Sequence, residues 1–198
     1  QRQIVQASFV ALLTIISIVA ISNFGISQWR VVQARSAMAS YDSPQLNNYA
    51  DEPLEFAAFR IEKEEVNVAE YRLCIEAGIC TAPNIDEFAT PISAIENDQL
   101  PITSVTAYQA YQFCQWIGRR LPTAAEWDYA AQGADQRNFP WADSDFPSPY
   151  PANVYHDYDE GLEVFDPDSL VTVNDPNFID GATDAGVMHM LGNVAEWV

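Results

Sequence analysis

The chain has 198 residues, 48% of them hydrophobic, and its 28 acidic residues outnumber 9 basic ones to give a net charge of −19. This length and apolar content suffice for one domain with its own core and argue against a disordered chain. The negative charge repels phosphate groups, which argues against nucleic acid as a partner, and it offers oxygen ligands to divalent cations.

The first predicted element is a hydrophobic helix near the N-terminus. No charge interrupts Ile4–Ile21, and 18 residues at 1.5 Å each reach about 27 Å, close to the hydrocarbon thickness of a bilayer. Trp29 and Arg30 follow where an interfacial anchor belongs. We therefore predict one transmembrane helix with its flanks over residues 1–30, making this a single-pass membrane protein. A buried core helix and a cleaved signal peptide are the alternatives.

A polar linker and a globular domain are predicted to follow. Residues 36–53 are small, polar and interrupted by Pro, without an apolar period. We therefore assign residues 31–53 to a linker and residues 54–198 to a domain. The acidic domain with its close cysteine pair favours the extracytoplasmic side of the membrane.

The first half of the domain is expected to contain a strand and a helix. Phe59 and Ile61 alternate within residues 56–66, which indicates a strand. A helix is predicted over residues 68–77, ended by Gly78.

Two further helices are predicted downstream. One covers residues 107–117 and is closed by Gly118. The other begins at Thr123, whose hydroxyl can cap the helix while Glu126 lies three residues on, in the pattern of a capping box. The bulky face of the first of these helices is expected to consist of Tyr108, Tyr111, Phe113 and Trp116.

Five blocks of the chain together resemble the formylglycine-generating-enzyme, or sulfatase-modifying-factor, family. This resemblance implies an α+β domain with the C-type-lectin-like fold and little regular secondary structure. The blocks are FRIEKEEVNVAEYRLCIEAG at 59–78, PITSVTAYQAYQFCQWIGRRLPTAAEWDYAAQG at 101–133, FPWAD at 139–143, PAN at 151–153 and MLGNVAEWV at 190–198.

The most specific part of the resemblance, GRRLPTAAEW, is interpreted as architecture. Leu121 and Trp127 can anchor it, and Pro122 suits the turn before a helix. Arg119 and Arg120 can bond carboxylates or carbonyl groups through two donors each. Helix-start chemistry thus accounts for the block without a catalytic role.

The resemblance implies two calcium sites. One would use Asn153 and the carbonyl of Val154, with Glu163 and the carbonyl of Phe165. The other would use the carbonyls of Gly192 and Val194 and the carboxylate of Glu196. Here His189 stands where the family has Asp or Asn, and an imidazole is a poor ligand for calcium. The alternative is that Asn153 and Glu196 only stabilise turns.

Three cysteines are present. Cys74 and Cys80 close a short loop at the end of a predicted helix, so they are candidates for a disulfide, with two reduced structural thiols as the alternative. The resemblance implies that Cys114 pairs with a cysteine near the C-terminus of the family domain. A buried apolar thiol is equally acceptable there.

The resemblance also implies a reaction in which a copper-binding cysteine pair oxidises a substrate cysteine to formylglycine with dioxygen. Thiolates select Cu(I), and the family places this pair after the block that here reads GNVAEW. None of the three cysteines aligns with the pair, so no catalytic residue is assigned.

Three functions are therefore considered. The first is a membrane-tethered oxidase acting on a protein or peptide substrate. The second is a lectin-like module for ligand binding or display, and the third is the sensor part of a membrane receptor. Two cysteines about five residues apart in the following sequence would favour the oxidase, and an upstream kinase domain would favour the sensor.

Overall fold

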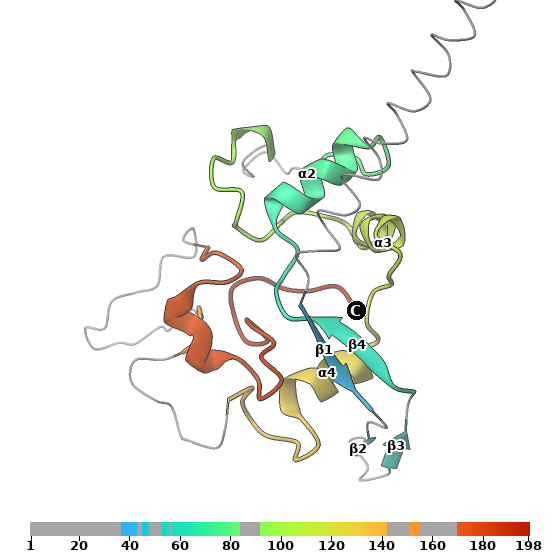
Figure 1. Cartoon of the computed structure of the whole chain (residues 1–198), viewed down its shortest axis with the longest axis vertical. Coiled ribbons are helices and arrows are strands. Elements are labelled where there is room, and N and C mark those ends of the chain that lie inside the picture. Colours follow the sequence, from blue (N-terminus) through green and yellow to red (C-terminus); the bar gives the residue numbers. More distant parts are fainter. Residues whose placement is uncertain are drawn as a thin grey trace, which may run out of the picture. The chain divides into compact units, whose positions relative to one another are not determined.

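A computed structural model of the chain describes residues 37–42, 45–47, 53–55, 57–83, 92–141, 151–154 and 170–198 (Figure 1). The chain divides into two units, Gln1–Arg35 and Ser36–Val198, and all of these described residues belong to the second. None of the helices in the described part combines the length and apolarity needed to cross a bilayer. The predicted transmembrane helix over residues 1–30 falls outside that part.

Two short antiparallel strand pairs form the β-structure. Strand β1 (Met38–Tyr41) pairs with β4 (Phe59–Glu62), and β2 (Gln45–Asn47) pairs with β3 (Pro53–Glu55). The register sets Tyr41 opposite Phe59, and their rings stack with centroids 4.8 Å apart. The strand predicted within residues 56–66 is thus confirmed, although it covers only the four residues of β4.

The predicted linker over residues 31–53 is wrong where β1 and β2 form. Strand β1 belongs to the domain, because Ala39 is 3% exposed and lies in its core. The strand has only four residues, two of them small, so its apolar alternation is too short to stand out from a polar tether. Its partner β4 lies about twenty residues away in the sequence. Strand β1 therefore forms because it pairs with β4, and not because of an apolar pattern in its own residues.

Three α-helices begin at the predicted starts or next to them, and the capping box predicted at Thr123 is confirmed. They are α2 (Val68–Glu76), α3 (Ala107–Trp116) and α4 (Ala124–Gln132). The 3-10 helix η1 (Ile92–Ala94) lies between α2 and α3 in the sequence, and the 3-10 helix η2 (Pro176–Gly181) follows α4. Each α-helix has a complete capping box, in which two backbone N–H groups at the helix start find side-chain acceptors. The three pairs are Asn67 with Glu70, Thr106 with Gln109, and Thr123 with Glu126.

The bulky face predicted for α3 is only partly correct. Phe113 is 2% exposed, but Tyr108 and Tyr111 are 67% and 48% exposed. The helix instead buries Gln109 and Phe113, four residues apart, followed by Ile117 at its end. Within this stripe, the ring of Phe113 stacks on the ring of Tyr71 on α2. The position of the neighbouring helix, rather than side-chain size, therefore decides which side of α3 is buried.

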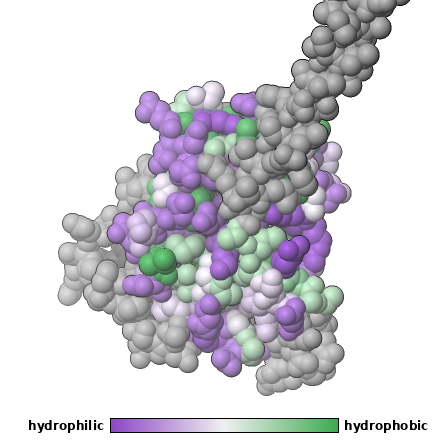
Figure 2. All heavy atoms as spheres, in the orientation of Figure 1, coloured by the Kyte–Doolittle hydropathy of each residue, from purple (hydrophilic) through white to green (hydrophobic). Residues whose placement is uncertain are grey.

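The core gathers segments from both ends of the domain. Ala39 of β1, Ala130 and Ala131 of α4, and Val187 and Met190 of the last segment form one buried cluster. Figure 1 shows α4 beside the β1–β4 pair, with the C-terminal segment returning to the same region. On the face shown in Figure 2, hydrophilic side chains cover much of the described surface, and smaller hydrophobic patches lie between them.

Candidate functional site

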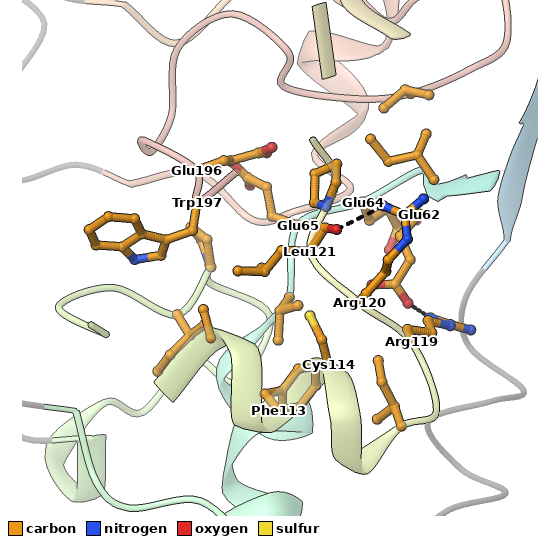
Figure 3. A pocket seen from close by; sticks show the side chains of 18 of the residues that line it. Glu62, Glu64, Glu65, Phe113, Cys114, Arg119, Arg120, Leu121, Glu196 and Trp197 are labelled. Carbon is orange, nitrogen blue, oxygen red and sulfur yellow. Dashed lines mark hydrogen bonds and ion pairs between the residues drawn. The ribbon is translucent and has the colours of Figure 1, made fainter. Parts of the chain in front are cut away.

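A cavity of about 390 Å³ lies between β4, helix α3 and the last residues of the chain. Its walls are mainly apolar, but glutamate and arginine side chains also line it, among them Glu65, Glu196 and Arg120, and Cys114 adds a thiol (Figure 3). Such a mixture of apolar walls and few convergent polar groups is typical of ligand sites. This cavity is therefore the candidate site among the described residues.

Glu65 is the most perturbed group in the cavity wall. Its Oε2 accepts a hydrogen bond of 2.7 Å from the Asn193 side chain, while its buried Oε1 finds no hydrogen-bond partner in the described part of the chain. The pKa of Glu65 is raised to about 8, chiefly by burial; the hydrogen bond from Asn193 opposes this shift and the nearby Glu196 carboxylate adds to it. A carboxyl group held in this way can carry a proton near neutral pH, or it can meet a cation.

Asn193 connects three segments of the chain at this point. Its side chain donates to Glu65, exchanges hydrogen bonds with the Val171 backbone, and accepts 3.1 Å from the Asn153 side chain. Its backbone N–H donates to the Asn153 carbonyl at 2.7 Å. Asn193 has a φ of 59°, a left-handed conformation that Asn tolerates better than most residues. Sequence reasoning passed over both Asn193 and Glu65.

Glu196 and Trp197 bind the end of the chain to the helices. Glu196 accepts a hydrogen bond of 2.6 Å from the indole of Trp127 on α4, and the indole of Trp197 donates to the Val105 carbonyl at 2.9 Å. Burial of the Glu196 carboxyl group raises its pKa, and the Trp127 bond opposes this shift. Among the acidic groups that line the cavity, Glu65 and Glu196 both have raised pKa values.

The arginine pair acts as the sequence predicted. Arg120 donates to both carboxylate oxygens of Glu126, at 2.7 and 2.6 Å, and Arg119 forms an ion pair with Glu62 of β4. Both pairs line the cavity, as Figure 3 shows for Arg119 and Arg120. The GRRLPTAAEW block thus fixes the cavity wall to the start of α4 and to the strand.

The cysteines divide into a disulfide and a thiol. Cys74 and Cys80 are joined by a disulfide, with Cα atoms 5.2 Å apart, and Cys114 is free. Cys114 points from α3 into the cavity, and burial raises its pKa to about 11. At neutral pH this thiol is protonated and thus a weak nucleophile.

Residues 30–198 match the family model described as a sulfatase-modifying factor enzyme 1-like domain. The chain belongs to this family. Membership implies the C-type-lectin-like fold, and the short strands and capped helices are consistent with its low content of regular structure.

Three curated relatives show the range of this family. The chain is 33% identical over 100 residues to a formylglycine-generating enzyme of Mycobacterium tuberculosis, covering 49% of this chain and 32% of that protein. It is 36% identical over 80 residues to serine/threonine-protein kinase pkn1 of Chlamydia pneumoniae, covering 33% and 13%. It is 31% identical over 112 residues to inactive C-alpha-formylglycine-generating enzyme 2 of Bos taurus, covering 55% and 36%. The chain thus spans about a third or less of two of these proteins and little more of the third.

Gly192 and Asn153, which belong to the two different calcium sites predicted from the family resemblance, lie next to each other in this structure. Gly192 lies so close to Asn153 that an added Cβ would come within 2.3 Å of the Asn153 carbonyl oxygen. The two segments that contribute oxygen ligands are therefore adjacent, and Glu65 lies beside them through its hydrogen bond with Asn193. Glu163 and Phe165 fall outside the described residues.

His189 does not join these oxygen groups. Its ring lies 6.0 Å from that of Phe178, and burial lowers the pKa of this histidine. No group of three or more His, Cys, Asp or Glu side chains within the described residues is placed to hold a metal ion. The donor types suit calcium at Glu196 and Asn153, so the calcium site remains a prediction that binding must test.

Copper does not fit the cysteines of this chain. Copper(I) needs thiolate ligands, but Cys74 and Cys80 are joined to each other and Cys114 stands alone in the cavity. These are all three cysteines of the sequence. No oxidation step is therefore assigned to any residue described above.

Proposed function

We propose that this chain is part of a membrane-tethered formylglycine-generating enzyme that oxidises a cysteine of a protein or peptide substrate. The family match over residues 30–198 is the observation that carries this proposal, and the similarity to the enzyme of Mycobacterium tuberculosis supports it. Uncharged Ile4–Ile21 supports the membrane anchor, with the acidic domain on the extracytoplasmic side.

In this function the described residues bind and position the substrate but do not react with it. The cavity offers apolar walls to a peptide side chain, while Glu65 and Glu196 provide acceptors for its polar groups. Bound copper would supply the oxidation chemistry, and its ligands would have to be thiolates other than Cys74, Cys80 and Cys114.

A non-catalytic module for ligand binding, display or sensing is the second candidate. The comparable identity to an inactive relative favours it. The similarity to a protein kinase of Chlamydia pneumoniae is consistent with the sensor form of this candidate. One lectin-like scaffold can host either function.

The test uses the full-length protein and a cysteine-containing peptide. The protein is loaded with copper(I) and incubated with the peptide under air, and the aldehyde is captured by a hydrazide reagent and located by mass spectrometry. Aldehyde at the cysteine, and none in the matched serine peptide, supports the enzyme. Peptide binding without aldehyde favours the binding module instead.

The membrane anchor is tested separately. The full-length protein is expected in the membrane fraction after alkaline carbonate extraction, whereas a variant lacking residues 1–35 should appear in the supernatant. Protease added to intact cells or right-side-out vesicles should digest the domain if it faces outward. Recovery of the full-length protein in the supernatant would contradict the anchor.

A further inference from the structure

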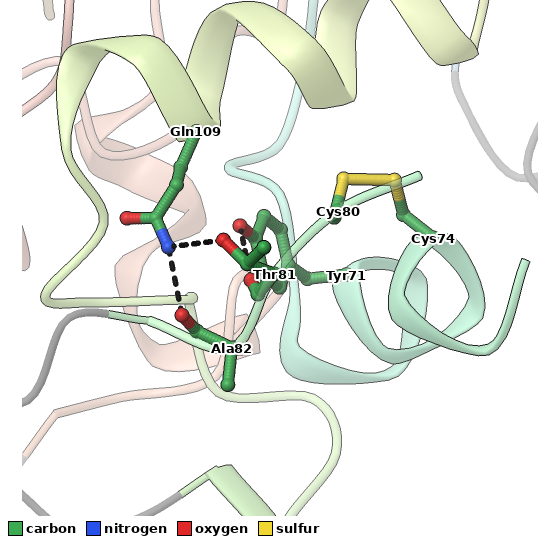
Figure 4. The surroundings of a disulfide bond; sticks show 6 residues. All are labelled: Tyr71, Cys74, Cys80, Thr81, Ala82 and Gln109. Carbon is green, nitrogen blue, oxygen red and sulfur yellow. Dashed lines mark hydrogen bonds between the residues drawn. A yellow bond between two sulfur atoms is a disulfide. The ribbon is translucent and has the colours of Figure 1, made fainter. Parts of the chain in front are cut away.

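The disulfide lies at the end of helix α2, away from the acidic groups of the cavity. It joins Cys74 in the last turns of α2 to Cys80, and the two residues are 0% and 5% exposed (Figure 4). The intervening turn is itself exposed, with Ile79 at 48%. The bond therefore fastens the segment that follows Cys80 to the buried side of α2.

The fastened segment, Thr81–Ala82, carries hydrogen bonds from two helices. On α3, the buried Gln109 side chain donates to the Thr81 hydroxyl at 3.0 Å and to the Ala82 carbonyl at 2.7 Å. On α2, the Tyr71 hydroxyl donates to the Thr81 carbonyl at 3.1 Å. Figure 4 shows these bonds converging on the segment directly after the disulfide.

The same two helices line the cavity. Tyr71 is 1% exposed, and its ring stacks on Phe113 with centroids 5.7 Å apart. Tyr71 and Phe113 both contribute to the cavity wall, and Cys114 follows directly on α3. Anything that loosens Thr81–Ala82 removes an acceptor from Tyr71 and two from Gln109, and so weakens the contact between the walls.

We propose that the Cys74–Cys80 disulfide is a redox-controlled latch, which closes the cavity around Cys114 when oxidised and loosens it when reduced. A dithiol reductant cleaves the S–S bond through a mixed disulfide, leaves two protein thiols, and is itself oxidised to a cyclic disulfide. Reduction removes the short covalent loop, so Thr81–Ala82 is held only by its hydrogen bonds. Its largely exposed position lets water compete for those bonds.

Access of the reductant follows from the position of the turn. Both sulfur atoms belong to buried residues, so attack requires local opening of the exposed turn between them. The turn includes Gly78, which has a φ of 72° and at which an added Cβ would meet no atom within 4 Å, so its surroundings leave room for such movement.

Cys114 is a built-in reporter for this latch. The rate of its alkylation by iodoacetamide is measured at fixed pH, and peptide mapping separates it from the other two cysteines. In the oxidised protein the rate should be low, since the thiol is only partly exposed and its pKa is raised. After reduction, or in the Cys74→Ser/Cys80→Ser variant, the rate should rise about tenfold as the closed state loses hydrogen-bond support.

Two conservative variants test the path from the latch to the cavity. Gln109→Glu keeps an oxygen for the Thr106 backbone N–H in the capping box but removes the amide donor to Thr81 and Ala82. Tyr71→Phe removes only the hydroxyl that donates to Thr81. Each should speed Cys114 alkylation in the oxidised protein and add little in the double-serine background. Tyr108→Phe, on the exposed face of α3, is the matched control and should change nothing.

Circular dichroism and thermal unfolding are measured for every variant whose alkylation rate is measured, so that global unfolding is not mistaken for opening of the cavity. If the folded double-serine variant alkylates at the rate of the oxidised protein, the latch is overturned. If that variant does not fold, Gln109→Glu and Tyr71→Phe decide. An unchanged rate in both of these folded variants overturns the proposed path.

Discussion

Arg120 holds Glu126 through two parallel hydrogen bonds, Nη1 to Oε2 at 2.7 Å and Nη2 to Oε1 at 2.6 Å. The Glu126 residue is only 6% exposed, and the same carboxylate accepts from the Thr123 backbone at 2.8 Å. One side chain therefore both caps α4 and anchors the arginine that lines the cavity. A mutation can remove the negative charge of Glu126 while keeping a side-chain oxygen that caps α4.

Replacing Arg120 by Lys should destabilise the domain by about 1 kcal/mol, because a single ammonium group cannot reproduce two parallel bonds and the arginine is partly exposed. Urea unfolding of the two proteins measures the difference. Arg60→Lys on the exposed side of β4 serves as the control and should have little effect. Equal stability of the Arg120→Lys variant and the wild type would show that the paired geometry contributes nothing.

The pH dependence of stability should reveal the Glu126 charge. The Arg120 hydrogen bond is the largest cause that lowers the pKa of Glu126 from 4.5 to about 2 in the folded state. Because the folded-state pKa is the lower one, the stabilisation is present above 4.5 and disappears as the pH falls toward 2.

The variant Glu126→Gln isolates this charge, because Gln also completes a capping box. It should be less stable than the wild type by about 1 kcal/mol near neutral pH, after discounting for the exposed arginine, and this difference should shrink as the pH falls. Urea titrations at a series of pH values provide the measurement. A difference that stays constant into strong acid would contradict the assignment.

Calcium should stabilise the domain if the adjacent oxygen groups bind it. Calcium at about 100 times its dissociation constant would add about 2.7 kcal/mol, so the melting temperature should rise with calcium and fall with a chelator. Asn153→Ala and Glu196→Gln should each reduce this rise, whereas Glu96→Gln on an exposed segment should not. Equal melting curves with calcium and with chelator would leave the carboxylates as structural groups only.

Two glycines with positive φ offer a matched pair for the close approach at Asn153. Gly118 has a φ of 75° with open space around it, so Gly118→Ala should cost about 1 kcal/mol from the left-handed conformation alone. Gly192 has a φ of 88° and would bring a Cβ against the Asn153 carbonyl oxygen, so Gly192→Ala should cost about 3 kcal/mol or more. Thermal unfolding compares the two, and similar losses would argue against tight packing at Gly192.

The sequence alone determined the helices and the family. The predicted start of α4 depends on Thr123 and Glu126, three positions apart, and such contacts form within one turn. The motif blocks indicated the family that the match over residues 30–198 then established. The cysteine pair lies only six residues apart, so its proximity was also visible before folding.

Only the tertiary structure decided the strand at Met38–Tyr41, the buried side of α3 and the cavity wall. The bond between Asn193 and Glu65 joins residues 128 positions apart, and no local pattern relates them. Likewise, Ala39 becomes a core residue only when β4 and α4 meet it. Desolvation then gives Glu65 its raised pKa, because burial depends on what the rest of the chain places around a side chain and not on its sequence neighbours.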